Sequence, residues 1–209
     1  MSVGTDKPAV TRSIGSDFWN VPNQLTTLRF VLSIVLFAFL SCGWFLTSMV
    51  LFMIAAGTDW IDGYWARKYG QVTMLGRILD PFVDKIIICG TFILLGSLQH
   101  LGSGVWAWMA VVIVGRELLV TALRSFLETH GTDFSAKLSG KLKMVLQCFA
   151  AATSLFVLWY GGAAPESPAH DIPTWMHYLL VGSVWAAVIS TVQSGIVYVI
   201  VALRMLRQG

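Results

Sequence analysis

The sequence predicts an all-α integral membrane protein with six transmembrane helices and both termini in the cytoplasm. The chain has 209 residues, of which 56% are hydrophobic and 12% are charged, and its mean hydropathy is +0.72. Such a composition is typical of membrane proteins. Six apolar segments, many of them near the roughly 20 residues that span a bilayer, are separated by short breaks. Lys and Arg are distributed unevenly around these segments, and this asymmetry predicts the topology.

The helices are predicted from the apolar runs and from the residues that interrupt them. Pro22 and Asn23 favour the start of the first helix, because proline suits a first helical turn. Glycine- and proline-containing breaks at Gly43, Gly102–Gly104 and Gly161–Pro173 separate successive helices. The apolar segments lie near residues 28–41, 45–66, 78–98, 105–126, 140–160 and 175–203. We expect residues 1–20 to form a tail with a short interfacial helix near residues 13–21, and residues 21–209 to form one transmembrane domain.

The basic residues orient the predicted bundle. All 14 Lys and Arg lie in the tails, or in or beside the connections near residues 67–77 and 116–143. The three other connections contain none, so the positive-inside rule places both termini and the two basic connections in the cytoplasm. The opposite helix ends carry an interfacial aromatic belt made of Trp106, Trp108, Trp159, Tyr160 and Trp175. The net charge of +3 reflects this asymmetry and does not indicate nucleic-acid binding.

The three cysteines, Cys42, Cys89 and Cys148, are far apart in apolar surroundings. An odd number without paired spacing predicts neither a disulfide framework nor a zinc motif. We expect buried, inert thiols at these positions.

Four aspartates in the second and third predicted helices are the main functional signal. Asp59 lies about 21 Å along a helix that starts near Phe45, and Asp84 lies about 21 Å from the end of the next helix. Asp62 and Asp80 match in the same way at about 26–27 Å. Two consecutive antiparallel helices therefore bring the four carboxylates to one level, near the cytoplasmic edge of the membrane.

The neighbours of these aspartates predict a site with room for a ligand. Asp59, Asp62, Gly63 and Ala66 share one helical stripe, and Gly76 shares another with Asp80 and Asp84. Small residues beside acids leave a hollow, and carboxylate oxygens without His or Cys suit Mg²⁺ or Mn²⁺. Two alternatives remain open, which are a solvated loop with chance acids and an ion-pair network in which Arg67, Arg77 and Lys85 neutralise the acids.

The pattern Asp59-x2-Asp62-Gly63-x2-Ala66-Arg67-x8-Gly76-x3-Asp80-x3-Asp84 resembles the signature of the CDP-alcohol phosphotransferases. The resemblance implies a six-helix membrane enzyme, commonly a homodimer, that uses two divalent cations to displace CMP from a CDP-linked donor with an alcohol. It implies that the four aspartates hold the ions and that Asp84 is the catalytic base. The donor site would comprise Gly63, Ala66, Arg67 and Gly76, to which we add Asn23 and Thr26 at the start of the first helix. Arg29 either reaches a polar ligand or snorkels to the interface.

A second polar stretch concerns the acceptor. Arg116 lies about 17 Å along the fourth predicted helix, which is deep for an arginine, so Glu117 or a bound anion should pair with it. We predict that a phosphorylated acceptor is bound by Arg116, Arg124, Lys137 and Lys141. Two roles fit Lys143 equally well: binding of the acceptor at this site, and anchoring of the helix at the cytoplasmic membrane interface.

This stretch resembles the phosphatidylglycerophosphate synthase branch of the family. The resemblance implies transfer of the phosphatidyl group of CDP-diacylglycerol to sn-glycerol 3-phosphate, in the bacterial inner (cytoplasmic) membrane or an organellar membrane. Membrane lipid and a second copy of the chain are the other expected partners, and no nucleic acid is expected. The alternatives are another acceptor, such as inositol phosphate, serine or a phosphatidyl lipid, or a divalent-cation transporter, although the inverted repeats common in such carriers are not evident.

Overall fold

The structure, a computed structural model, describes residues 21–69, 74–129, 138–164 and 172–206. Within helices, the side chains of residues 59–80 and of a few positions near helix ends are outside the described part. The helices are α1 (Val21–Ser41), α2 (Phe45–Tyr69), α3 (Met74–Ser97), the short 3-10 helix η1 (Gln99–Leu101), α4 (Ala107–Thr129), α5 (Leu138–Tyr160) and α6 (Thr174–Leu206). Each of the six predicted segments therefore coincides with an α-helix, and α2 and α3 extend further toward their connection than the apolar runs do.

Two of the predicted glycine breaks end helices by the same local geometry. At the end of α1, Gly43 has a φ of 79°, its N–H donates to the carbonyl of Leu40, and the N–H of Trp44 donates to the carbonyl of Phe39. Gly162 has a φ of 63° at the end of α5, where the same pair of bonds forms. This is the Schellman arrangement, which favours glycine because a side chain is strained at positive φ.

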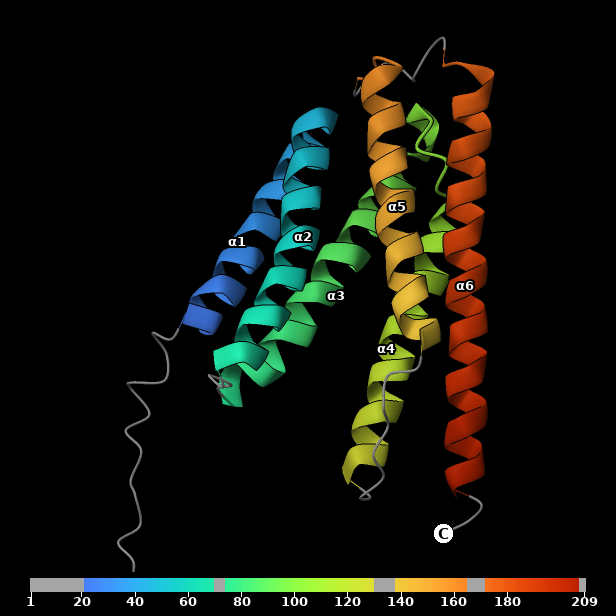
Figure 1. Cartoon of the computed structure of the whole chain (residues 1–209). Coiled ribbons are helices and arrows are strands. Elements are labelled where there is room, and N and C mark those ends of the chain that lie inside the picture. Colours follow the sequence, from blue (N-terminus) through green and yellow to red (C-terminus); the bar gives the residue numbers. More distant parts are fainter. Residues whose placement is uncertain (1–20, 70–73, 130–137, 165–171, 207–209) are drawn as a thin grey trace, which may run out of the picture.

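The six long helices pack as two neighbouring groups of three, α1 to α3 and α4 to α6 (Figure 1). Helix α1 packs on α2 and α3, α5 packs on α6 and α2, and α3 packs on α4. The start of α1 and the end of α6 lie at the same end of the bundle (Figure 1). Between the groups, α3 and α4 approach closely, since a Cβ built on Gly96 would lie 3.4 Å from the backbone of Ala107. The fully buried core includes Leu36, Phe52, Phe92, Met109, Ile113 and Leu155.

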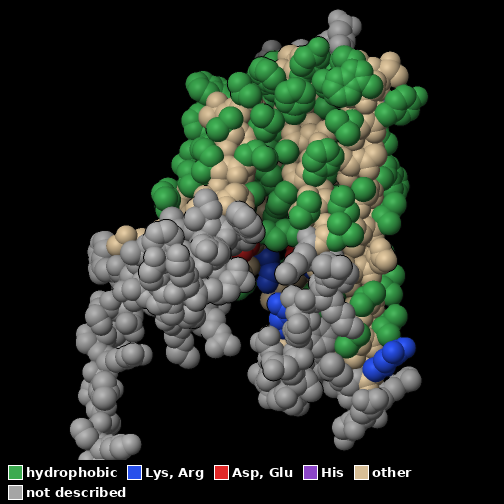
Figure 2. Space-filling view, viewed as in Figure 1, with side chains coloured by type: hydrophobic (Ala, Val, Ile, Leu, Met, Phe, Trp, Pro, Cys, Tyr) green, Lys and Arg blue, Asp and Glu red, His purple; other side chains and the backbone are tan. Residues whose placement is uncertain are grey.

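The outer surface of the bundle is apolar. Large hydrophobic side chains are exposed along the outside of the long helices, for example Val111 at 70% and Ile189 at 59%, and they cover most of the face in Figure 2. Within the described ranges, two helical stretches, Leu142–Tyr160 and Thr174–Arg204, are long and apolar enough to cross a membrane. These features identify an α-helical membrane protein. Helices α2 and α4 are less apolar because ionisable residues interrupt them.

The predicted belt residues are all exposed. They lie beside the start of α4, the end of α5 and the start of α6. The prediction for the thiols is wrong at Cys42, which is exposed, while Cys89 and Cys148 are half-buried. Cys42 is exposed because it follows the last residue of α1 and lies in the turn before α2. The predicted tail and interfacial helix lie outside the described residues.

Candidate active site

The backbones of α2 and α3 carry the four aspartates at matching heights. Asp59 lies ten residues before the end of α2 and Asp84 ten residues after the start of α3, or about 15 Å in each case. Asp62 and Asp80 lie seven and six residues from the same ends. Helices α2 and α3 are in contact, and four residues connect them. The predicted antiparallel arrangement of the two helices thus agrees with the structure.

Asp84 is the aspartate whose side chain is described. Its Oδ1 accepts a hydrogen bond of 2.6 Å from Nη1 of Arg29, and the two side chains are 27% and 2% exposed. The side chains of the other predicted metal and donor residues in these helices lie outside the described part, namely Asp59, Asp62, Gly63, Ala66, Arg67, Gly76 and Asp80. Among the side chains that are described, no group of three or more His, Cys, Asp or Glu is close enough to hold a metal ion. The metal site therefore stays a prediction.

Arg29 corrects part of the interpretation made from sequence. A snorkelling arginine would extend its guanidinium to water, whereas Arg29 is buried and pairs with Asp84 across the contact between α1 and α3. The signal was present in the sequence, because an ionisable residue inside an apolar helix usually has a buried partner. The partner itself, 55 residues away, is set by the packing of α1 on α3.

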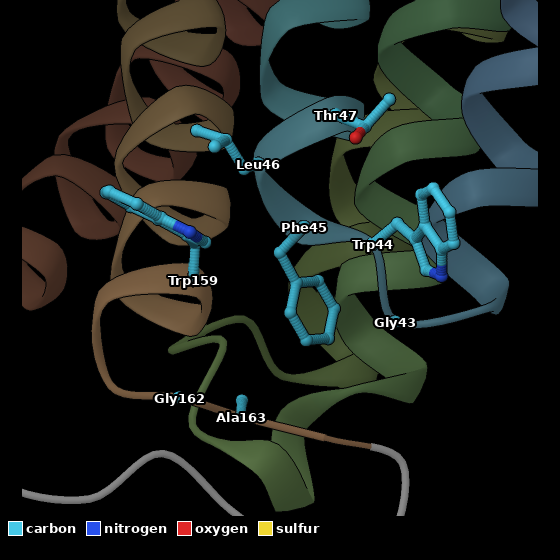
Figure 3. Close-up of a pocket in the computed structure, with 8 residues that line it drawn as sticks. All are labelled: Gly43, Trp44, Phe45, Leu46, Thr47, Trp159, Gly162 and Ala163. Carbon is cyan, nitrogen blue, oxygen red and sulfur yellow. The ribbon is translucent and has the colours of Figure 1, made fainter.

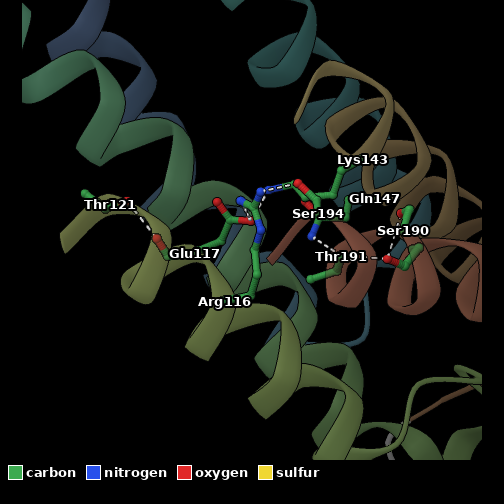
Figure 4. Close-up of polar contacts among 9 residues, drawn as sticks. Arg116, Glu117, Thr121, Lys143, Gln147, Ser190, Thr191 and Ser194 are labelled. Atoms are coloured by element: carbon green, nitrogen blue, oxygen red, sulfur yellow. Dashed lines mark hydrogen bonds and ion pairs between the residues drawn. The ribbon is translucent and has the colours of Figure 1, made fainter. Parts of the chain in front are cut away.

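A second ionic cluster joins α4 and α5 (Figure 4). Glu117 and Lys143 are 8% and 6% exposed, and the Lys143 ammonium donates to Oε1 of Glu117. Nη1 of Arg116 is 3.4 Å from the same oxygen. The predicted pairing of Arg116 with Glu117 is therefore confirmed, but Lys143 is the nearer partner. Because Lys143 is buried and paired, it belongs to this cluster and is not an anchor in the membrane interface.

Helix α6 supplies neutral partners to the cluster. Nη2 of Arg116 donates to the Ser194 hydroxyl at 2.5 Å, and its guanidinium lies over the Tyr198 ring at 5.4 Å from the centroid. One turn earlier, Thr191 accepts a hydrogen bond of 2.9 Å from Nε2 of Gln147 (Figure 4). Gly195 leaves space for Arg116, since a Cβ there would lie 3.1 Å from Cγ of that arginine. Residues of α4 and α6 therefore fix the position of the Arg116 guanidinium, and α5 contributes through the contact of Lys143 with Glu117.

The remaining predicted binding residues are placed as follows. Thr26 is buried at 4% exposure near the start of α1. Arg124 is half-buried two turns beyond Glu117 on α4, and its Nε has no hydrogen-bond partner among the described residues. The sequence also predicts binding roles for Asn23, Lys137 and Lys141, but their side chains lie outside the described part.

The Arg29–Asp84 ion pair and the cluster of Arg116, Glu117 and Lys143 both lie next to α5. A small hollow beside Asp84 is lined by Met144 and Cys148 of α5, together with Ala55, Ala56, Ile87 and Ile88. Lys143 and Gln147 occupy the same two turns of α5, so this helix connects the Asp84 region to the Arg116 region. Figure 2 shows acidic and basic side chains together in a recess near the lower end of the molecule. The arrangement places a carboxylate and several cations at one end of the bundle, below a surface that is otherwise apolar.

A second hollow, of about 360 Å³, lies at the other end of α2 and α5 (Figure 3). It is lined by residues of the turn before α2 and of the end of α5, namely Gly43, Trp44, Phe45, Leu46, Thr47, Trp159, Gly162 and Ala163. None of these lining side chains is ionisable. This hollow therefore offers neither a base nor an anion-binding group, and the polar recess is the better candidate for chemistry.

Comparisons with known proteins agree with this arrangement. The model of the family described as CDP-alcohol phosphatidyltransferase matches residues 19–205. A CDP-diacylglycerol–glycerol-3-phosphate 3-phosphatidyltransferase of Bacillus subtilis (strain 168) is 32% identical over 198 residues, which cover 85% of this chain and 92% of the relative. Enzymes with the same name from Escherichia coli (strain K12) and Pseudomonas fluorescens are also similar. The first is 33% identical over 68% of this chain and 78% of its own length, and the second is 39% identical over 54% and 58%. The chain therefore belongs to the CDP-alcohol phosphatidyltransferase family.

Proposed function

We propose that this protein transfers the phosphatidyl group of CDP-diacylglycerol to sn-glycerol 3-phosphate, with phosphatidylglycerophosphate and CMP as products. The observation that carries the proposal is that the Asp84 carboxylate on α3, which is paired with Arg29, and a cluster of Arg116, Glu117 and Lys143 on α4 and α5 lie at the same end of the bundle. The names of the similar enzymes support this donor and acceptor. The acceptor is a small dianion, so a buried arginine with a neighbouring lysine suits its phosphate.

We infer that Asp59, Asp62, Asp80 and Asp84 hold two divalent cations, Mg²⁺ or Mn²⁺. The donor chemistry fits, because Asp84 offers a hard carboxylate oxygen that is 27% exposed and carboxylates are ligands that these ions prefer. Bound ions would neutralise the charge of the pyrophosphate and of the departing CMP. For the donor we assign Gly63, Ala66, Gly76, Arg67, Asn23 and Thr26 to the cytidine and phosphate contacts.

In the proposed reaction, Asp84 accepts the proton of the primary hydroxyl of glycerol 3-phosphate. The hydroxyl oxygen attacks the phosphorus that bears diacylglycerol, a new P–O bond forms, and the bond between that phosphorus and the oxygen of CMP breaks. Arg29 fixes the orientation of the Asp84 carboxylate through its charge-assisted hydrogen bond. Arg116 holds the acceptor phosphate, and the Arg124, Lys137 and Lys141 side chains add positive charge around it.

We propose that the six long helices all cross the bacterial cytoplasmic membrane, with the polar recess on the cytoplasmic side. Described Lys and Arg side chains are confined to the lower part of the face in Figure 2, which is the arrangement that the positive-inside rule requires. A site at this boundary lets the acyl chains of the donor stay in lipid while the acceptor arrives from water. We also propose that the chain acts as a homodimer.

Release of CMP by the purified protein tests the function. Wild-type protein in detergent is given CDP-diacylglycerol, Mg²⁺ and one acceptor from a panel of glycerol 3-phosphate, inositol phosphate, serine and phosphatidylglycerol. We expect CMP release with glycerol 3-phosphate and at least 100-fold less with the others. Preference for another acceptor contradicts the assigned substrate, and cation flux through vesicles without CMP release supports a transporter.

Asp84→Asn tests the base within the same assay. The amide cannot accept the proton, so we expect CMP release to fall by at least about 10²-fold. The elution volume in size-exclusion chromatography and the thermal unfolding curve control for folding. Activity close to wild type would remove Asp84 from the role of base.

A further inference from the structure

Gln147 has a buried acceptor atom that no described residue satisfies. The side chain is 0% exposed, and its Oε1 has no hydrogen-bond partner among the described residues. The orientation of the amide follows from its neighbour: the Thr191 hydroxyl donates its proton to the carbonyl of Ala187 at 2.6 Å. Its oxygen can then only accept from Gln147, which must present Nε2 at 2.9 Å. The unsatisfied atom is therefore the carbonyl oxygen.

Arg116 leaves a complementary atom unsatisfied on the same side of α6. Its Nε–H is buried and has no acceptor among the described residues, whereas its Nη2 is bound by Ser194. Thr191 and Ser194 are three residues apart on α6, so they lie on one helical face about one turn apart. Gln147 and Arg116, each bound to one of these hydroxyls, thus present one acceptor and one donor to the same region. Buried polar groups in folded proteins nearly always have partners, so two in one place indicate a ligand that supplies both.

The same part of α5 also faces the reacting carboxylate. Cys148, which follows Gln147, lines the hollow that contains Asp84. A ligand between Arg116 and Asp84 therefore passes the turn of α5 that carries Gln147. Glycerol 3-phosphate has a phosphate at one end, a primary hydroxyl at the other and one hydroxyl between them. Its phosphate can accept from Arg116, and its central hydroxyl is the donor that Oε1 of Gln147 lacks.

We propose that Gln147 determines acceptor specificity by accepting a hydrogen bond from the central hydroxyl of glycerol 3-phosphate. The inference rests on the proposed function and adds a residue and a substrate group to it. A buried acceptor atom left without its donor weakens binding of any analogue that lacks the hydroxyl. We expect the wild-type enzyme to prefer glycerol 3-phosphate over such an analogue by about 10- to 100-fold in kcat/KM.

The test compares two acceptors that differ only in this hydroxyl. Glycerol 3-phosphate and 1,3-propanediol monophosphate share the phosphate and the attacking primary hydroxyl, so both can complete the reaction. CMP release is measured with each acceptor for wild type, for Gln147→Leu, and for Ser154→Ala as a matched control. Ser154 is also on α5, is 0% exposed, and has a hydroxyl with no hydrogen-bond partner in the described part of the chain, but it lies two turns farther from Lys143.

In the proposed arrangement, Gln147→Leu uses the two acceptors with kcat/KM values that differ by less than about threefold. The change comes mainly from loss of activity with glycerol 3-phosphate. Ser154→Ala keeps the wild-type preference. A wild-type enzyme that uses both acceptors equally well overturns the proposal, and this comparison needs no variant to fold. A preference that persists in Gln147→Leu overturns it as well. Absence of CMP with either acceptor is a different result, which refutes the proposed function together with this inference.

Discussion

Replacement of Lys143 by Met tests whether the buried ion pair with Glu117 holds α4 and α5 together. Met has a similar length and no charge, so the variant removes the ammonium group and leaves the Glu117 carboxylate buried, at 8% exposure. Loss of one partner from a buried pair costs about 3–5 kcal/mol. Nη1 of Arg116 remains 3.4 Å from the same oxygen, so the lower end of this range, about 3 kcal/mol, is expected.

Thermal unfolding in detergent, followed by tryptophan fluorescence, measures this cost. For a chain of this size, 1 kcal/mol corresponds to about 2–4 °C, so the midpoint should fall by about 6–12 °C. Arg204→Met is the matched control, because Arg204 is exposed in the last turn of α6 and its loss should change stability by less than about 0.5 kcal/mol.

A double variant separates the ion pair from other effects. With Glu117→Gln added to Lys143→Met, no carboxylate is left unpaired, so the loss should be smaller than the sum of the two single losses by at least about 1 kcal/mol. A midpoint for Lys143→Met within about 2 °C of wild type would refute the reasoning. So would strictly additive losses in the double variant.

Three further predictions concern binding, metal and packing. Arg116→Ala should raise KM for glycerol 3-phosphate about tenfold or more and leave KM for CDP-diacylglycerol within about twofold, because the lost contact is to the acceptor phosphate; an equal loss for both substrates in steady-state assays argues against this assignment. Treatment with a chelator should abolish CMP release and added Mg²⁺ or Mn²⁺ should restore it, and undiminished activity after chelation excludes a metal requirement. Gly90→Ala should lower the stability by about 1–3 kcal/mol, since its Cβ would lie 2.2 Å from the Phe37 ring. Gly57→Ala, with nothing within 4 Å of the new Cβ, should raise the stability by as much as about 1 kcal/mol in the same unfolding assay. Equal unfolding midpoints for Gly90→Ala and Gly57→Ala would contradict the packing of α1 on α3.

Local sequence signals predicted the elements well. Hydrophobic run length and the breaking residues located all six long helices, because an apolar segment of this length has few alternatives to a helix in a membrane. The helix ends were predicted less well. Helix α2 continues to Tyr69 and α3 already starts at Met74, so both extend beyond the apolar runs, because charged and polar residues can also be helical. Cys42 was wrongly expected to be buried, since its exposure depends on the turn after α1.

Pairwise contacts in the site were predicted only in part. The proximity of Arg116 and Glu117 followed from their adjacency in the sequence, and the height match of the four aspartates followed from helix rise alone. The partners Arg29 and Asp84, and Glu117 and Lys143, are 55 and 26 residues apart. Helical periodicity predicts which residues share a face, but it does not predict which faces meet.

The amino-acid sequence by itself determined that this protein is a helical membrane protein, and it placed the aspartates within two consecutive helices, because hydrophobic length and helix rise depend only on the order of residues. The tertiary structure decided that Arg29 reaches Asp84, that Lys143 is an internal counterion, and that Thr191 orients the Gln147 amide. Those contacts arise from how α1 packs on α3 and how α4, α5 and α6 converge. Buried charges and amides must find partners across helix interfaces, and only the packed bundle determines which partners are within reach.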